Sequence, residues 1–142
     1  MVLLLYLSAL LYVLLFAERN VRGLNGYNIQ LLAEIQRYIK YREVLGLKLV
    51  TQNLFGNVVG FLPLGFLLPH INNQYKKMLK TVCVVAMFSL GIEFIQLCLR
   101  VGCFDVDDVL LNTLGGLGGY GLWMVCGVIR KKYECKKTTK EI

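Results

Sequence analysis

The chain has 142 residues, of which 56% are hydrophobic, and its formal net charge is +7. The hydrophobic share exceeds that of an average soluble domain, so the distribution of the apolar residues decides between a soluble protein and a membrane protein. The basic residues stand between and after apolar blocks. We therefore interpret the charge as a topology and lipid-surface signal, and we exclude nucleic-acid binding. The five cysteines contain no C-x-x-C pair, which predicts neither a disulfide framework nor a zinc site.

Four apolar blocks predict four transmembrane helices, at about 2–18, 53–70, 79–99 and 108–129. A membrane span needs about 20 apolar residues, with roughly 17 as the lower limit. The third and fourth blocks reach that length, and the first two reach it when flanking residues lie in the interfaces. The first block lacks a basic n-region and an A-x-A-like cleavage site, so we interpret it as a retained anchor. Pro63 predicts a kink in the second span.

The 19–52 loop contains apolar residues at helical spacing, namely Leu31, Leu32, Ile35, Tyr38 and Ile39. This pattern predicts either an amphipathic helix on the outer bilayer surface or a small extracellular helical hairpin packed on the bundle. The tail at 130–142 is basic and polar, and we expect it to be mobile and in contact with anionic lipid. Because its basic run directly follows a span, the positive-inside bias places both termini in the cytoplasm.

These elements predict an all-α fold for residues 1–142 as one domain, a four-helix transmembrane bundle with an amphipathic helical segment in the extracellular loop. Polar residues lie on one helical face near one end of each span. They are Glu18, Arg19, Asn53, Asn57, Ser89, Glu93, Gln96, Arg100, Asp105, Asp108 and Asn112. In an antiparallel bundle these ends share one side, which is the outside in this topology. The G-x-x-x-G pairs Gly56/Gly60 and Gly115/Gly119 predict close helix contacts beside these residues.

The residue types of this cluster fit acid–base chemistry and anion binding. Glu93 is an acid about two turns inside a span, a position that is costly without a partner and marks a functional candidate. We expect it to act as a general base or acid, with Asp105 and Asp108 as further catalytic candidates. Arg19 and Arg100 are candidates for binding a phosphate or carboxylate.

Three aspartates offer hard oxygen ligands for Mg²⁺ or Ca²⁺, namely Asp105, Asp107 and Asp108, although their spacing is not that of an EF-hand loop. The competing interpretation of the whole cluster is structural. In that case Glu18, Glu93 and the aspartates pair with Arg19 and Arg100 in a buried salt-bridge network that fixes helix register.

Four segments of the sequence resemble the VanZ-like family of bacterial membrane proteins. They are Glu18-Arg19, N-L-F-G-N-V-V-G-F-L-P-L-G-F-L-L-P from Asn53 to Pro69, S-L-G-I-E-F-I-Q from Ser89 to Gln96, and F-D-V-D-D-V-L-L-N-T-L-G-G-L-G-G-Y from Phe104 to Tyr120. The family also tends to carry an N-L-I-P-F-like segment in the first loop, whereas this chain has Asn28-Ile29-Gln30-Leu31-Leu32 there, without the Pro-Phe. The resemblance implies a multi-pass protein of the bacterial cytoplasmic membrane, linked to glycopeptide (teicoplanin) resistance.

Three functions stay open at this point. The first is an enzyme or binding protein for an anionic envelope lipid or a lipid-linked cell-wall precursor, held by Glu18, Arg19, Asn53, Asn57, Gln96, Arg100 and Asn112. The second is a non-enzymatic protein with a structural polar cluster, whose outer face masks a target or docks a partner. The third is a transporter, which is disfavoured because the spans carry no polar path from Ser89 to the cytoplasm and number only four. A homo-oligomer could supply more spans.

Overall fold

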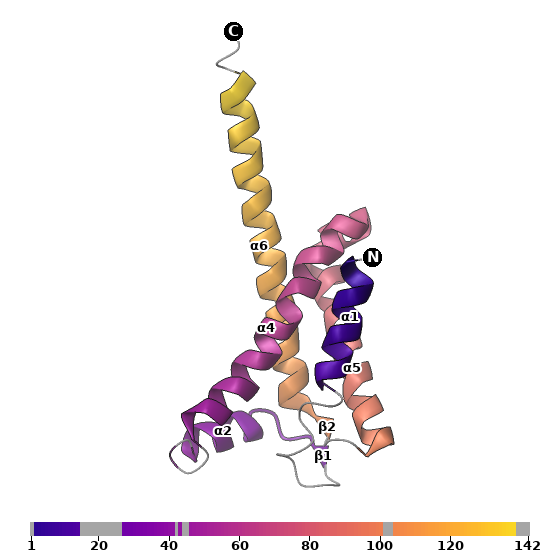
Figure 1. Cartoon of the computed structure of the whole chain (residues 1–142), viewed down its shortest axis with the longest axis vertical. Helices are drawn as coiled ribbons and strands as arrows, with labels where there is room; N and C mark the ends of the chain where they lie inside the picture. Colours follow the sequence, from indigo (N-terminus) through magenta and orange to yellow (C-terminus); the bar gives the residue numbers. More distant parts are fainter. Residues whose placement is uncertain (1, 15–26, 42, 44–45, 101–103, 139–142) are drawn as a thin grey trace.

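The computed structural model describes residues 2–14, 27–41, 43, 46–100 and 104–138, and most of them are helical. In chain order the elements are α1 (Val2–Tyr12), β1 (Tyr27–Asn28), α2 (Ala33–Lys40), α4 (Leu47–Ile71), the 3₁₀ helix η2 (Asn73–Lys76), α5 (Met78–Leu99), β2 (Phe104–Asp105) and α6 (Val106–Thr138). Figure 1 shows α4 running obliquely across α6. The first residues of α4 and α6 and the last residues of α5 lie toward the lower end of that view.

Three helices in the described part of the chain are long and apolar enough to cross a membrane. Their apolar stretches are Leu54–Ile71, Met78–Leu99 and Val106–Glu134. By length and composition they coincide with the spans predicted at 53–70, 79–99 and 108–129. The first predicted span contains α1, an apolar helix of 11 residues. At about 1.5 Å per residue α1 is roughly 16 Å long, about half of a bilayer core. Residues 15–18 of that span lie outside the described residues, so the span at 2–18 stays a prediction.

Two helices are longer than the sequence predicts. α4 already begins at Leu47, and Pro63 and Pro69 both lie inside it. α6 continues to Thr138, so the tail from residue 130 is helical over most of its length. Its mobility and its contact with anionic lipid stay predictions. Arg130 forms an ion pair with Glu134, with 3.0 Å between Nε and Oε1. Such an i,i+4 pair joins successive turns and supports the extension by a few tenths of a kcal/mol, about 0.3–0.5.

The helix α2 lies in the loop where the sequence predicts an amphipathic segment. It contacts both α4 and α6. Tyr38 is buried, while Leu31, Leu32 and Ile39 are exposed. One face of this segment therefore packs on the long helices, as the hairpin alternative proposes. The contact of its other apolar residues with a bilayer surface stays a prediction.

Glycines bring α4 and α6 into backbone contact. A Cβ atom built on Gly65 would lie 2.6 Å from the carbonyl carbon of Gly116, and a Cβ on Gly119 would lie 2.8 Å from the backbone nitrogen of Phe66. A Cβ on Gly115 would collide with the backbone of Val58. Only a hydrogen at these positions allows the observed approach, as in other small-residue contacts between membrane helices.

The prediction that the glycines lie between helices was therefore correct for Gly115 and Gly119 of α6 and wrong for Gly56 of α4, while Gly60 of α4 faces α1 and not α6. Gly115 and Gly119 form the contact, but Gly56 has open space around it, and a Cβ on Gly60 would make an ordinary 3.4 Å contact with Leu10. Because α4 crosses α6 obliquely, Gly65 is the α4 glycine at the crossing. Gly116 also allows α5 to pack closely on α6, since a Cβ at this position would lie 2.6 Å from the side chain of Val85.

A small apolar core lies between the helices. It consists of Leu10, Phe61, Leu64, Leu68, Val85 and Ile92. Large apolar side chains on the outer faces of α4 and α5 are open to the surroundings, since Phe55, Met87 and Phe94 are each more than 60% exposed. An exposed apolar surface of this extent fits contact with lipid.

Candidate functional site

The buried polar residues gather where α5 ends and α6 begins, near the β1–β2 pair at the lower end of Figure 1. Glu93 and Gln96 come from the last two turns of α5, and Asn57 comes from α4. Asp105 ends β2, and Asp107, Asp108 and Asn112 belong to the first turns of α6. All seven side chains are buried, together with Ser89. We call the eight residues the polar cluster.

Glu93 and Asp105 connect the end of α5 to the start of α6. Glu93 Oε2 accepts a hydrogen bond from the backbone N–H of Asp105 at 3.0 Å. Asp105 Oδ1 in turn accepts from the backbone N–H of Asp107 at 2.9 Å. Asp105 immediately precedes α6, so its side chain satisfies an N–H of the first turn in the manner of an N-cap. Its carboxylate also lies where the positive end of the helix dipole stabilises negative charge.

Asp107 points to a different element from Asp105 and Asp108. It is rotated about 100° around the helix from Asp108. Its two carboxylate oxygens accept hydrogen bonds from the backbone N–H groups of Leu32 and Ile35, the latter at 3.2 Å. These N–H groups belong to the start of α2, where Leu32 has no capping bond of its own side chain. Asp107 therefore caps α2 from another helix and holds the first loop against α6.

Two pairs of polar side chains join α6 to its neighbours. Asn57 Nδ2 donates to Asp108 Oδ1 at 2.7 Å, which links α4 to α6. Asn112 Nδ2 donates to Ser89 Oγ at 2.8 Å, which links α5 to α6. Both pairs are buried, so they contribute to the register of the three helices.

Two amide oxygens of the polar cluster accept no hydrogen bond from the part of the chain that the structure describes. Gln96 Nε2 donates to the carbonyl oxygen of Leu14 at 2.8 Å, but Gln96 Oε1 accepts nothing from the described residues. Asn112 Oδ1 also accepts no hydrogen bond from the described residues, and Asn112 is only 2% exposed. A buried acceptor without a donor costs about 1–3 kcal/mol. An ordered water or a ligand that brings O–H or N–H groups would satisfy such atoms.

The structure separates some predicted site residues from the polar cluster. Arg100 ends α5 in the left-handed conformation, with φ 55°, and its side chain is exposed at the rim. Glu18, Arg19 and the side chain of Asn53 lie outside the described residues. Within the described ranges, no three carboxylate, histidine or cysteine side chains stand close enough to hold a metal ion. The predicted cation site at Asp105, Asp107 and Asp108 gains no support there, because Asp107 faces α2.

Sequence periodicity identified most members of the polar cluster but not all their partners. The spacing that places Ser89 on the stripe of Glu93 and Gln96 anticipates its position facing Asn112. No sequence signal indicates that Asp107 caps α2, because that contact depends on how a distant loop returns to α6.

Comparisons with known proteins agree with this architecture. A family model described as VanZ/LLP1 matches residues 3–127. The protein named Protein VanZ of Enterococcus faecium is 33% identical over 91 residues, which are 64% of this chain and 54% of that protein. This chain thus spans about half the length of that curated relative. No solved structure matches the chain. Because the family model matches residues 3–127, which include α4, α5, the whole polar cluster and the larger part of α6, the chain belongs to the VanZ/LLP1 family.

Proposed function

We propose that this chain is a VanZ-type envelope protein whose polar cluster binds the headgroup of an anionic lipid or a lipid-linked cell-wall component. In this proposal α1 and the residues that follow it form the span at 2–18. Both termini are cytoplasmic, and the polar cluster faces outward. The three spanning helices and the gathering of polar residues at one end support it. The relative named Protein VanZ and the family's link to teicoplanin resistance direct the proposal to the cell envelope.

The observation that carries the proposal is the pair of buried amide oxygens that find no donor among the described residues. A network that only fixed helix register would gain from satisfying Gln96 Oε1 and Asn112 Oδ1. A ligand with hydroxyl or amine groups would supply the missing donors. Sugars and peptide amines carry such groups, and both occur in lipid-linked cell-wall components. Arg100 at the exposed rim would then bind the phosphate of the same ligand, as Arg commonly does.

Binding is the part of the proposal that the geometry supports best. A reaction at this site would use Glu93 as the acid or base, and Asp105 and Asp108 would be the next candidates. In the structure, each of these carboxylates accepts a hydrogen bond from the protein itself, Glu93 and Asp105 from backbone N–H groups and Asp108 from Asn57. The same bonds favour the second candidate function, in which the cluster is structural and the outer face masks a target or docks a partner.

The isosteric variant Glu93→Gln separates the two functions. It keeps an acceptor for the Asp105 N–H but removes the charge. Thr113→Val is the matched control, because the Thr113 hydroxyl donates at 2.7 Å only to the carbonyl of Val109 in its own helix. Both variants would be expressed in a teicoplanin-susceptible Enterococcus faecium host. Membrane level and size-exclusion profile would be measured beside teicoplanin susceptibility.

The binding proposal expects Glu93→Gln to insert and elute like the unmodified chain while any protection against teicoplanin is lost. It expects Thr113→Val to retain that protection. If Glu93→Gln misassembles and protection falls only in step with its membrane level, the result favours a structural polar cluster and contradicts the binding site. If the unmodified chain gives no protection at all, the link to teicoplanin is wrong for this chain.

A further inference from the structure

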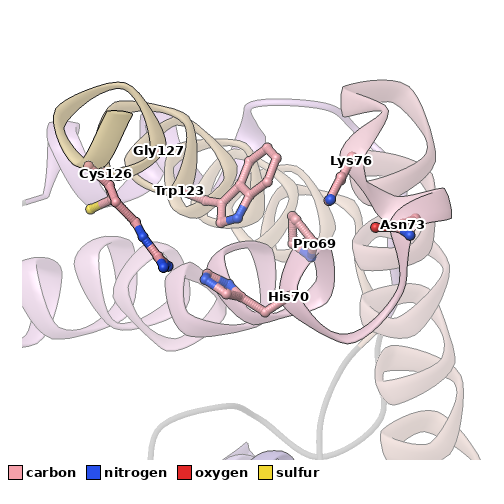
Figure 2. Close-up of a pocket in the computed structure, with 8 residues that line it drawn as sticks. Pro69, His70, Asn73, Lys76, Trp123, Cys126 and Gly127 are labelled. Atoms are coloured by element: carbon pink, nitrogen blue, oxygen red, sulfur yellow. The ribbon is translucent and has the colours of Figure 1, made fainter. Parts of the chain in front are cut away.

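A second polar feature lies at the other end of the molecule, where α4 ends beside α6. An open cleft of about 480 Å³ is formed there by the last residues of α4, by η2 and by α6. Its polar and aromatic lining is His70, Asn73, Lys76, Trp123 and Arg130. In Figure 2 the side chains of Lys76 and Asn73 extend from η2 toward Trp123, and His70 lies below Trp123. We call this feature the basic cleft.

Helix length places the basic cleft at the depth of lipid headgroups when α6 enters the bilayer core at Val106. About 20 helical residues cover the roughly 30 Å of a bilayer core, so a span that starts at Val106 leaves the core near residue 125. Trp123 and Arg130 therefore stand at and just beyond this boundary, and α4 ends at the same level with Ile71. Trp at the interface and basic residues just outside it are the usual arrangement at membrane surfaces.

The walls of the basic cleft are held in place by hydrogen bonds. The Tyr120 hydroxyl donates at 2.7 Å to the carbonyl of Lys76, which ties η2 to α6. The His70 ring lies 3.1 Å from the Phe66 carbonyl through Nδ1. The same ring meets Trp123 edge-on, with 6.4 Å between the ring centroids. These contacts fix the positions of α4, η2 and α6 around the cleft.

The chemistry of the basic cleft fits an anionic group. Lys76 and Arg130 bring two positive charges, and Asn73, His70 and the indole of Trp123 add N–H donors. Among the described residues, Arg130 pairs with the carboxylate of Glu134. Both of these side chains are mostly exposed, and exposed pairs of this kind contribute about 0–1 kcal/mol. A phosphate can therefore exchange with Glu134 at little cost.

We propose that the basic cleft binds the phosphate of an anionic membrane phospholipid in the leaflet opposite the polar cluster. Lys76 and Arg130 hold the phosphate, and Trp123 contacts the glycerol region. Leu122 and Val125, which are exposed apolar residues on α6, offer a surface for the acyl chains. This site is independent of the proposed outward-facing function, because it shares no residue with the polar cluster.

The test is lipid binding to the purified full-length chain by native mass spectrometry, with phosphatidylglycerol as probe and phosphatidylcholine as the neutral comparison. The site variant is Lys76→Gln with Arg130→Gln. The charge-matched control is Lys77→Gln with Lys132→Gln, which removes two exposed basic residues outside the cleft lining. The thermal midpoint of each variant shows that it remains folded.

The site variant should bind phosphatidylglycerol about tenfold or more weakly, since each basic contact near a lipid surface contributes roughly a factor of five. The control should bind it as the unmodified chain does, and binding of phosphatidylcholine should not change. Equal weakening in the control would overturn the site in favour of general surface charge. Displacement of bound phosphatidylglycerol by millimolar inorganic phosphate would overturn the lipid assignment in favour of a soluble anion.

Discussion

Replacing Gly65 or Gly119 by alanine should force α4 and α6 apart. The new Cβ would stand 2.6 Å from the carbonyl carbon of Gly116 in the first case and 2.8 Å from the Phe66 nitrogen in the second. Comfortable contacts between such atoms are about 3.5–4.0 Å, so the helices must separate by roughly 1 Å. Overpacking of this kind costs about 1–3 kcal/mol. For a chain of this size we expect the thermal midpoint to fall by about 2–12 °C.

The assay is the thermal midpoint of the purified chain in detergent, followed by the size-exclusion peak that survives heating. Gly118→Ala and Gly121→Ala are the matched controls, because a Cβ at either position meets nothing within 4 Å. These controls should be neutral or slightly stabilising, since alanine favours a helix over glycine by about 1 kcal/mol. If Gly65→Ala and Gly118→Ala melt together, the backbone contact between α4 and α6 does not exist as described.

Three further predictions concern the loop, the helix register and the topology. Asp107→Asn should loosen α2, because it removes the charge and one of the two acceptors at its start. Amide hydrogen exchange should then rise at 31–41 and stay unchanged in the long helices, whereas unaltered exchange at 31–41 would contradict the cap. Asn57→Asp places a second carboxylate opposite Asp108. It should lower the free energy of unfolding by roughly 1–3 kcal/mol, and the thermal midpoint should fall with it. Adding Asp108→Asn should restore it, and additive losses would show that the two residues are not coupled. In intact cells a membrane-impermeant maleimide should label Cys103 and not Cys135 in variants that retain one of these thiols, and labelling of Cys135 alone would reverse the proposed topology.

Helical periodicity explains why much of the polar cluster could be predicted from the sequence. Glu93 and Gln96 fall on one face of α5, and Asn112 follows Asp108 by one turn in α6. Each face is a local property of its helix. Antiparallel order then places both faces at the same end, where Ser89 bonds with Asn112.

Contacts that depend on crossing angle or on loop paths could not be predicted in this way. The glycine of α4 at the crossing is Gly65 and not Gly56, because periodicity does not give the angle between helices. The cap that Asp107 provides to α2 depends on the return of the first loop to α6. The basic cleft depends on α6 continuing beside η2 as far as Arg130, so His70 showed no signal in the sequence.

The most direct test of the binding site is the thermal shift that a lipid-linked cell-wall precursor produces in the unmodified chain and in Ser89→Ala/Asn112→Leu. This double change replaces a partly satisfied buried pair by apolar groups, so the ligand-free midpoint should stay equal or rise. At about 100 times its dissociation constant, a bound precursor should stabilise the unmodified chain by about 2.7 kcal/mol. That corresponds to roughly 5–11 °C, and the double variant should lose this shift. A ligand-free midpoint that falls sharply in the double variant, with the full lipid shift retained, would show that the polar cluster holds the helices together and binds no headgroup.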